Sequence, residues 1–221
     1  MPLSPNICGV ILAAGASTRM GRDKALLPWP PVAEGTPAAN TVLGATIDLL
    51  QQYSELVIVV AGRNAAAIAP VVYAHAAYLT VNRDPDRGQF SSLQVGLQEV
   101  LNQGRDAALI TLIDRPPVLP GTLQTLRDAF RYAAPGIWAV VPEVTRGEQN
   151  LHGHPILISR EVIHTFLKAP PTSTAREIEH AHQQHIQYVP VDDPRIAMNI
   201  DTPEDYARLS GAEMISSEKQ F

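Results

Sequence analysis

The sequence predicts an open α/β fold of three layers, in which helices cover both faces of a mostly parallel sheet. Short runs rich in Val, Ile and Leu alternate along the chain with helical patterns. These runs are almost continuously apolar, as in strands that are buried on both faces of a parallel sheet. With 221 residues, of which 45% are hydrophobic and 18% charged, the chain is long enough to bury such a core.

Each element is predicted from its own pattern. Leu43, Ile47 and Leu50 recur at i, i+4 and i+7, which predicts an amphipathic helix from about Ala38 to Tyr53. The strand-length apolar runs are Ile7–Ala13, Leu56–Ala61, Ala107–Ile113 and Ile137–Pro142. Further helices are expected at Ser92–Asn102, Pro120–Ala133, Arg160–Leu167 and Thr174–His185. The alternation implies right-handed crossovers between parallel strands.

The later part of the chain departs from this alternation. Pro155–Ser159 and Ile186–Val191 read as short strands that would pair antiparallel at one end of the sheet. Pro28–Pro37 is a proline-rich excursion, and no repeat or linker indicates a second domain. We therefore expect one domain over residues 1–221, with an ordered core at about 7–208 and a frayed tail at 209–221.

Composition narrows the classes of partner. A formal net charge of −5 argues against nucleic acid or an anionic membrane surface as the main partner. No apolar run approaches the ~18–20 residues that span a bilayer, and the first residues lack the basic region of a signal peptide. Cys8 is the one cysteine, so neither an internal disulfide nor a cysteine zinc site is expected. These features predict a cytoplasmic protein.

The loop after the first predicted strand is the strongest local signal. Ligands of open α/β sheets bind at the carboxyl ends of the strands, and this loop gathers glycines, hydroxyls and cations as a polyphosphate cradle requires. It contains neither a Walker A motif, because Gly21 is followed by Arg22, nor Gly-x-Gly-x-x-Gly. An ordinary polar loop with solvated charges is the alternative. The segment reads Leu12-Ala13-Ala14-Gly15-Ala16-Ser17-Thr18-Arg19-Met20-Gly21-Arg22-Asp23-Lys24.

This segment resembles the L-A-A-G-x-S-x-R-M-G-x-x-K signature of the MobA-like nucleotidyltransferases, and is most similar to their molybdenum cofactor cytidylyltransferase branch. The resemblance covers about residues 7–208. It implies a three-layer α/β/α, Rossmann-like nucleotidyltransferase fold, with a mostly parallel sheet and a small antiparallel part. Four further blocks share it: residues 82–84 with 88–97, 112–118, 153–155 and 199–206.

The resemblance implies a reaction in which the phosphate of an acceptor attacks the α-phosphorus of an NTP and releases pyrophosphate. CTP is the favoured donor, because Ala13-Ala14-Gly15 follows the cytidylyl pattern rather than the Ala-Gly-Gly form of the guanylyl branch. Lys24 and Arg19 would neutralise the phosphates and, with Asp114, act in catalysis. The implied nucleotide-binding residues are Leu12, Ala13, Ala14, Gly15, Ser17, Arg19, Gly21, Lys24, Asn82, Gly88, Ser91 and Ser92. Helix capping is an alternative role for the two serines.

Two carboxylates are implied ligands of Mg²⁺. Asp114 closes an apolar strand, where a carboxylate can hold Mg²⁺ against a nucleotide; capping of the turn before Pro116 is the alternative. Arg115 and Pro117 depart from the family pattern. Asp201 is the implied second ligand, and Asn199 competes for that role. The residues after Asp201 also form a helix-start pattern, Thr202-Pro203-Glu204-Asp205, which needs no function to explain it.

The acceptor implied by the resemblance is molybdopterin cofactor, with a molybdoenzyme as a possible recipient of the product. Its expected binding residues are His152, Gly153, His154 and Pro155. His180, His182 and His185 do not share one helix face, so we expect solvated side chains rather than a zinc site. Cys8 is expected in the core.

Two rival functions remain at this stage. A sugar-phosphate or alditol-phosphate nucleotidyltransferase would share the phosphate loop and the metal ligands but differ around Gly153–Pro155. A non-catalytic nucleotide-binding or cofactor-delivery protein belongs to another class, and the presence of both Lys24 and Asp114 argues against it. Acceptor identity and oligomeric state stay open.

Overall fold

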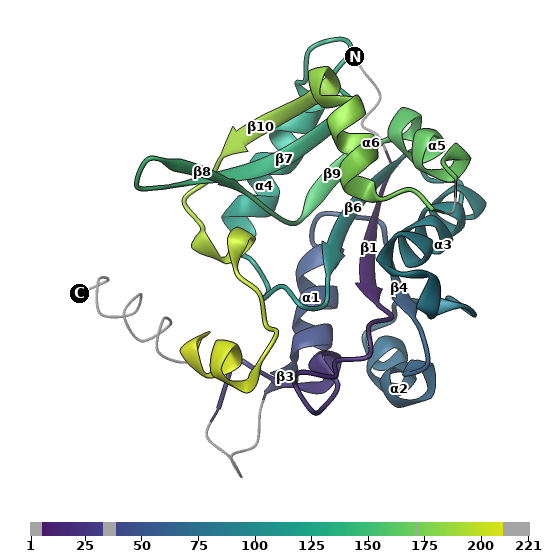
Figure 1. Ribbon diagram of the computed structural model, residues 1–221, viewed down its shortest axis with the longest axis vertical. Helices are drawn as coiled ribbons and strands as arrows, with labels where there is room; N and C mark the ends of the chain where they lie inside the picture. Colours follow the sequence, from purple (N-terminus) through teal and green to yellow (C-terminus); the bar gives the residue numbers. More distant parts are fainter. Residues whose placement is uncertain (1–5, 33–38, 171, 210–221) are drawn as a thin grey trace.

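A mostly parallel sheet forms the centre of the computed structural model, which describes residues 6–32, 39–170 and 172–209. Within these residues the sheet has the order β10-β7-β9-β6-β1-β4-β5, with β8 paired to β7 (Figure 1). Its strands are β1 (Ile7–Ala13), β4 (Leu56–Ala61), β5 (Tyr78–Val81), β6 (Ala107–Leu112), β7 (Ala139–Arg146), β8 (Gln149–His152), β9 (Ile156–Ser159) and β10 (Ile186–Pro190). A separate ribbon pairs β2 (Pro28–Trp29) with β3 (Asn40–Thr41).

Strand directions confirm the predicted fold class. β1 runs parallel to β4 and β6, β4 to β5, and β7 to β10, whereas β9 is antiparallel to β6 and β7, and β8 is antiparallel to β7. The expected antiparallel pairing is thus right for β9 and wrong for β10. Two successive helices join β9 to β10 and return the chain to the opposite direction, so that β10 runs along β7.

Helices cover both faces of the sheet. The bounds are α1 (Val42–Gln51), α2 (Ala65–Ala74), α3 (Gln89–Asn102), α4 (Pro120–Arg131), α5 (Arg160–Lys168) and α6 (Ala175–Ala181). The first helix begins later than predicted because the hydroxyl of Thr41 accepts from the Gly44 amide at 3.0 Å and caps it; Ala38 lies outside the described residues. The predicted helix Thr174–His185 ends at Ala181 and continues as a 3₁₀ turn, Gln183–His185. Helix α2 was not predicted, because its alanine-rich sequence with Pro70 shows no clear periodicity.

The hydrophobic core has two halves, one on each face of the sheet, because successive side chains of a strand point to opposite faces. Ile7, Ile11 and Ala13 of β1 join the cluster under α1, α2 and α4. Cys8, Val10 and Leu12 join the cluster under α3, α5 and α6. Burial raises the pKa of the Cys8 thiol to about 12, in agreement with its predicted place in the core. The sheet is therefore buried on both faces, as its apolar runs predict.

Contacts near the end of the described chain limit the predicted tail. Residues 203–209 are helical, and the hydroxyl of Tyr206 donates to the Pro28 carbonyl. Leu209 is buried, so the tail cannot begin there; residues 210–221 lie outside the described part. No helix among the described residues is both long enough and apolar enough to cross a bilayer.

Candidate functional site

A cleft of about 230 Å³ lies at the carboxyl ends of β1 and β6, where ligands of open α/β sheets bind. It combines three segments that are distant in the sequence: the loop after β1, the segment that opens α3, and the end of β6. The lining residues are Leu12, Ala14, Gly15, Ser17, Lys24, Pro85, Gly88, Gln89, Ser92, Leu112, Ile113 and Asp114. Eight of these are among the residues that the sequence predicted for the site.

Two residues with positive φ shape the loop that follows β1. Ser17 has φ 50° and Gly21 has φ 73°, and the Ser17 hydroxyl accepts from the Lys24 amide at 3.3 Å. Asp23 caps the short 3₁₀ turn Lys24–Leu26 by accepting from the Ala25 amide at 3.0 Å. The loop is therefore held by its own side chains, and Gly21 provides a conformation that other residues rarely adopt.

Asn64 ties this loop to the sheet, a role that the sequence did not reveal. Its amide group donates to the Ala13 carbonyl at 3.0 Å and to the Asp23 carboxylate at 2.8 Å, and its side-chain oxygen accepts from the Gly62 amide. Gly62 is required here because a Cβ at this position would lie 2.7 Å from the Ala14 carbonyl oxygen. Ala13, the last residue of β1, is buried, so the loop starts from a fixed point in the core.

Lys24 is the buried cation of the cleft. Its side chain is 10% exposed, and its ammonium donates to Asp201 at 2.7 Å. The guanidinium of Arg19 is largely exposed and lies 3.4 Å from the same carboxylate oxygen. The hydrogen bond from Lys24, aided by the charges of Lys24 and Arg19, lowers the pKa of Asp201. Asp201 is thus ionised beside two cations that a phosphate could also neutralise.

Helix capping does not account for Asp201. The adjacent helix is capped by Thr202, whose hydroxyl accepts from the Asp205 amide, while the Asp205 carboxylate accepts from the Thr202 amide. The Asp201 side chain instead faces Lys24, Arg19 and Asn199, whose amide lies 3.4 Å from the second carboxylate oxygen. The carboxylate of Asp201 therefore faces the segment that follows β1, which carries Lys24 and Arg19.

The backbone brings Asp201 beside Asp114. The Ile200 amide donates to the Asp114 carbonyl at 2.7 Å, and Arg115 donates to the Met198 carbonyl at 3.1 Å. Arg115 therefore points into the protein, and does not extend into solvent. The buried carboxylate of Asp193 fixes the same segment, because it accepts hydrogen bonds from the Leu119 amide and the Thr122 hydroxyl. The sequence pattern did not indicate this role of Asp193.

The carboxylates of Asp114 and Asp201 suit a divalent cation. Oxygen Oδ1 of Asp114 is buried and, among the described residues, has no hydrogen-bond partner, which is costly for a carboxylate that binds nothing. Mg²⁺ needs only one or two carboxylates when phosphate oxygens and water complete its shell. No group of three or more His, Cys, Asp or Glu residues in the described chain forms a metal cluster. Two carboxylates would therefore suffice only for a cation that takes its other ligands from phosphate oxygens and water.

Asn82 and the two serines form a buried support for the segment that opens α3. The amide of Asn82 donates to the hydroxyls of Ser91 and Ser92 at 2.8 and 3.0 Å, and its oxygen accepts from the Asp84 amide. Ser92 also lines the cleft, whereas Asn82 and Ser91 do not. The capping alternative fails because Gly88 is the N-cap and no side chain caps α3.

The four predicted acceptor residues have separate environments. His152 is exposed, pairs with Glu143 at 2.8 Å and stacks on Tyr188, and it does not line the cleft. Gly153 packs against the backbone of Ile196, and Pro155 is buried. His154 lines a second, larger cavity. Burial, aided by the charge of Arg115, lowers the pKa of His154 to about 4.

The histidines near α6 were expected to be solvated, which holds for His180 alone. The rings of His185 and Trp138 stack with centroids 3.6 Å apart, and His182 lies 5.8 Å from Trp138. Both histidines line the larger cavity. Local patterns could not predict this contact, because the partner, Trp138, immediately precedes β7 and is distant in the sequence.

Comparison with known proteins places this geometry in one family. The MobA-like NTP transferase domain matches residues 9–187. The molybdenum cofactor cytidylyltransferase of Escherichia coli K12 is 25% identical over 199 residues, which cover 89% of this chain and 92% of the relative. The molybdenum cofactor guanylyltransferase of Xanthomonas euvesicatoria is 27% identical over 205 residues, covering 91% and 93%.

Solved structures agree with the sequence comparison. Rv0371c from Mycobacterium tuberculosis H37Rv superimposes with a TM-score of 0.73 at 29% identity, over 92% of this chain and 97% of that one. A complex of Rv0371c with manganese gives a TM-score of 0.70 at 28% identity, with the same coverage. The cleft, the signature loop and these matches together show that the chain belongs to the MobA-like NTP transferase family and is a nucleotidyltransferase.

Proposed function

We propose that this protein transfers a cytidylyl group from CTP to the phosphate of molybdopterin cofactor. The observation that carries the proposal is the convergence of Gly15, Lys24, Ser92 and Asp114 in one cleft, with Asp201 paired to Lys24. An oxygen of the acceptor phosphate attacks the α-phosphorus of CTP. The bond from that phosphorus to the oxygen bridging the β-phosphate breaks, and pyrophosphate leaves with the electron pair. The attacking phosphate is already anionic near neutral pH, so no general base is required.

The protein's own contribution is positioning and neutralisation of charge. Backbone amides of residues 15–21 would face the phosphates, and Lys24 would exchange its contact with Asp201 for a phosphate oxygen. Arg19, whose side chain is largely exposed and lies near Asp201, would also neutralise phosphate charge. A buried ammonium in a confined cleft acts more strongly on developing charge than one in water.

Asp114 and Asp201 would hold a divalent cation, which we propose is Mg²⁺. When bound, the cation neutralises phosphate charge and aligns the reacting oxygens. The unpartnered oxygen of Asp114 supports this assignment, as does the presence of manganese in a related structure. Asn199 touches Asp201 and remains in reach as a further oxygen donor.

The preference for CTP rests on Ala14. Ala14 lines the cleft, and its side chain and carbonyl group lie close to Gly62. If the nucleobase lies beside Ala14, as the proposal requires, the methyl group would narrow the space for the base and so favour the smaller pyrimidine. Relatives with both donor names occur, so the donor needs a direct test.

Pyrophosphate release tests the whole proposal. The purified protein is given molybdopterin cofactor with CTP, GTP, ATP or UTP, with and without Mg²⁺, and a panel of sugar and alditol phosphates replaces the acceptor. We expect turnover with CTP and molybdopterin cofactor that depends on the metal. Preference for GTP, turnover with a sugar or alditol phosphate alone, or nucleotide binding without turnover would each overturn it.

A further inference from the structure

Asn64 is the N-cap residue of α2, a position where an asparagine side chain normally accepts a hydrogen bond from its own helix. Its side chain makes no such bond here. Its amide group donates instead to the Ala13 carbonyl at the end of β1 and to the Asp23 carboxylate, and its oxygen accepts from the Gly62 amide. The side chain of Asn64 is therefore used to hold the loop after β1 rather than to cap α2.

The contact with Asp23 is the one that reaches the cleft. One oxygen of the Asp23 carboxylate accepts from the Ala25 amide at 3.0 Å, and the other accepts from Asn64 at 2.8 Å. The first bond caps the 3₁₀ turn Lys24–Leu26, so the second fixes that turn relative to the sheet. Lys24 begins the turn and lines the cleft. The orientation of Lys24 thus depends on Asp23, and that of Asp23 on Asn64.

The same contact keeps an acidic side chain occupied beside the cations. Asp23 is the one acidic residue of segment 12–24, which also carries Arg19, Arg22 and Lys24. A carboxylate that could turn freely would pair with a neighbouring cation and neutralise charge that a phosphate needs. Asn64 is uncharged, so it can hold the Asp23 carboxylate by a hydrogen bond without adding a charge of its own.

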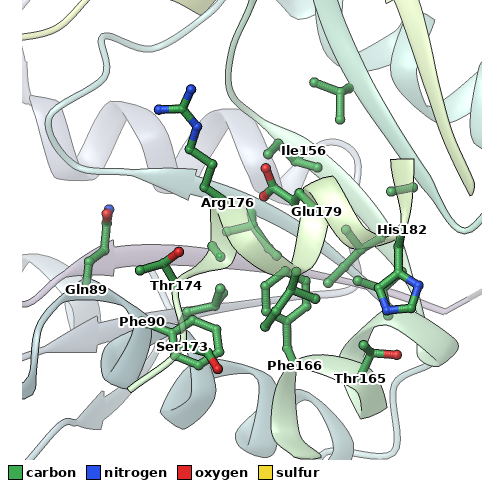
Figure 2. A pocket seen from close by; sticks show the side chains of 18 of the residues that line it. Gln89, Phe90, Ile156, Thr165, Phe166, Ser173, Thr174, Arg176, Glu179 and His182 are labelled. Atoms are coloured by element: carbon green, nitrogen blue, oxygen red, sulfur yellow. The ribbon is translucent and has the colours of Figure 1, made fainter. Parts of the chain in front are cut away.

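Asn64 acts from outside the space that a ligand would fill. It lines neither the cleft nor the larger cavity of about 760 Å³, whose wall includes Phe90, Phe166 and Glu179 (Figure 2). Any effect of Asn64 on a nucleotide in the cleft therefore passes through the residues that it holds.

We propose that Asn64 is a positioning residue for nucleotidyl transfer, which orients the Lys24 ammonium toward the nucleotide phosphates by holding Asp23 against the end of β1. The proposal rests on the proposed function in that it takes Lys24 to be the cation that meets the phosphates. It does not depend on the base of the donor or on the acceptor. A displacement of about 1 Å in a reacting group can cost roughly 100-fold in rate, so one hydrogen bond behind the cleft can matter.

The coupling between Asn64 and Lys24 tests this role. Asn64→Ala, Lys24→Met and the double variant are compared with the wild type in kcat/KM for CTP. Calorimetry measures their affinity for inorganic tripolyphosphate in the presence of Mg²⁺, a probe that carries the phosphates common to all NTPs. We expect Asn64→Ala to lower both quantities roughly 10-fold when Lys24 is present, and by no more than about two-fold when it is replaced by Met.

Gln51→Ala is the matched control for the loss of a side-chain amide. Gln51 donates to the His75 carbonyl at the other end of α2 and lies outside the cleft. We expect this variant to keep the wild-type kcat/KM and tripolyphosphate affinity to within about two-fold, as for a surface substitution away from the site. Melting temperatures of all variants show whether each is folded at the temperature of the assay.

A reversed pair tests the contact with Asp23. Asn64→Asp keeps the shape of the side chain but sets a second carboxylate against Asp23, and should weaken tripolyphosphate binding roughly 10-fold. Adding Asp23→Asn should restore part of this loss, beyond the effect of Asp23→Asn alone. The amide introduced at position 23 can donate to the carboxylate introduced at position 64, while its oxygen can still cap the turn. Absence of this recovery in a folded protein would overturn the proposed route through Asp23.

The outcomes separate this proposal from the proposed function. Equal losses from Asn64→Ala with and without Lys24 would show a role in the fold alone and overturn the positioning role. An unchanged tripolyphosphate affinity in Asn64→Ala or in Lys24→Met would overturn it too, even where CTP turnover is normal. Coupled losses of tripolyphosphate affinity in a protein that does not turn over CTP with molybdopterin cofactor would support the role of Asn64 and overturn the proposed function alone.

Discussion

The ammonium of Lys24 lies 2.7 Å from the carboxylate of Asp201, although 177 positions separate the two residues. This pair joins the loop after the first strand to the segment that follows the last one. Asp201 holds the ammonium of Lys24 within the cleft. Under the proposed function, a phosphate would then meet a cation that is already oriented, which is the preorganisation that favours charged transition states.

Lys24→Met tests the role of this cation. The substitution keeps the length of the side chain and removes its charge, so we expect kcat/KM to fall roughly 100-fold or more, as for loss of a transition-state contact. The fold should survive because Asp201 keeps Arg19 and some contact with water. Lys168→Met, at the exposed end of α5, is the control. Turnover within a few-fold of wild type would show that Lys24 only balances Asp201.

Asp114→Asn and Asp201→Asn test the shared cation site. Each variant should lose metal-dependent turnover, and the double variant should lose little more than either one, since partners in one site are not additive. Initial rates are measured across a Mg²⁺ titration. If the fold-losses of the two single variants multiply in the double variant, the two carboxylates have independent roles. Normal turnover in Asp201→Asn would leave Asp201 as only the ion-pair partner of Lys24.

The fold was predictable because strands that are buried on both faces leave a nearly continuous apolar signal. Leu56–Ala61 agrees with its prediction at both ends. The missed elements lack that signal: α2 is rich in alanine, and β5 has Tyr78 and Val81 exposed at the edge of the sheet. The direction of β10 depends on how two helices return the chain, which local patterns do not encode.

The site was predictable where chemistry concentrates in one segment. Gly15, Ser17 and Lys24 come from one loop, and all line the cleft. Asn64, Asp193 and Trp138 were missed because each acts through contacts between distant segments. Asn82 and Ser91 were expected beside the nucleotide, and only the fold shows that their side chains hydrogen-bond to each other.

Ala14→Gly tests the basis of the donor preference. Ala14 lines the cleft, so removing its methyl group enlarges the cleft, and we expect the ratio of kcat/KM for CTP over GTP to fall roughly 10-fold, the effect of one methyl group in a pocket. Both donors are assayed under competition in one reaction. An unchanged ratio would place the discrimination elsewhere in the cleft.

Gly153→Ala tests the packing of the 153–155 segment. A Cβ at Gly153 would lie 1.8 Å from the Ile196 carbonyl oxygen, and neither backbone can yield without displacing its neighbours. We expect a loss of unfolding free energy of about 1–3 kcal/mol, as for overpacked cores. Gly121→Ala is the matched control, because nothing lies within 4 Å of the added methyl group. Equal melting temperatures for the two variants would show that the segment moves freely.

His154 should make the stability of the protein depend on pH. Its pKa is lowered to about 4 by burial and by Arg115, from an ordinary value of 6.5, so the unfolded chain binds more protons between these two values. The stability due to neutral His154 is therefore fully present above pH 6.5 and is lost as the pH falls toward 4.

His154→Gln removes the titrating group. Relative to this variant, the wild type should lose about 2–3 kcal/mol of unfolding free energy between pH 7 and pH 4.5. Urea denaturation at both pH values, on both proteins, measures the difference. Other acidic groups titrate alike in the two proteins and cancel, so equal losses would mean that His154 is hydrated and free to protonate in the folded state.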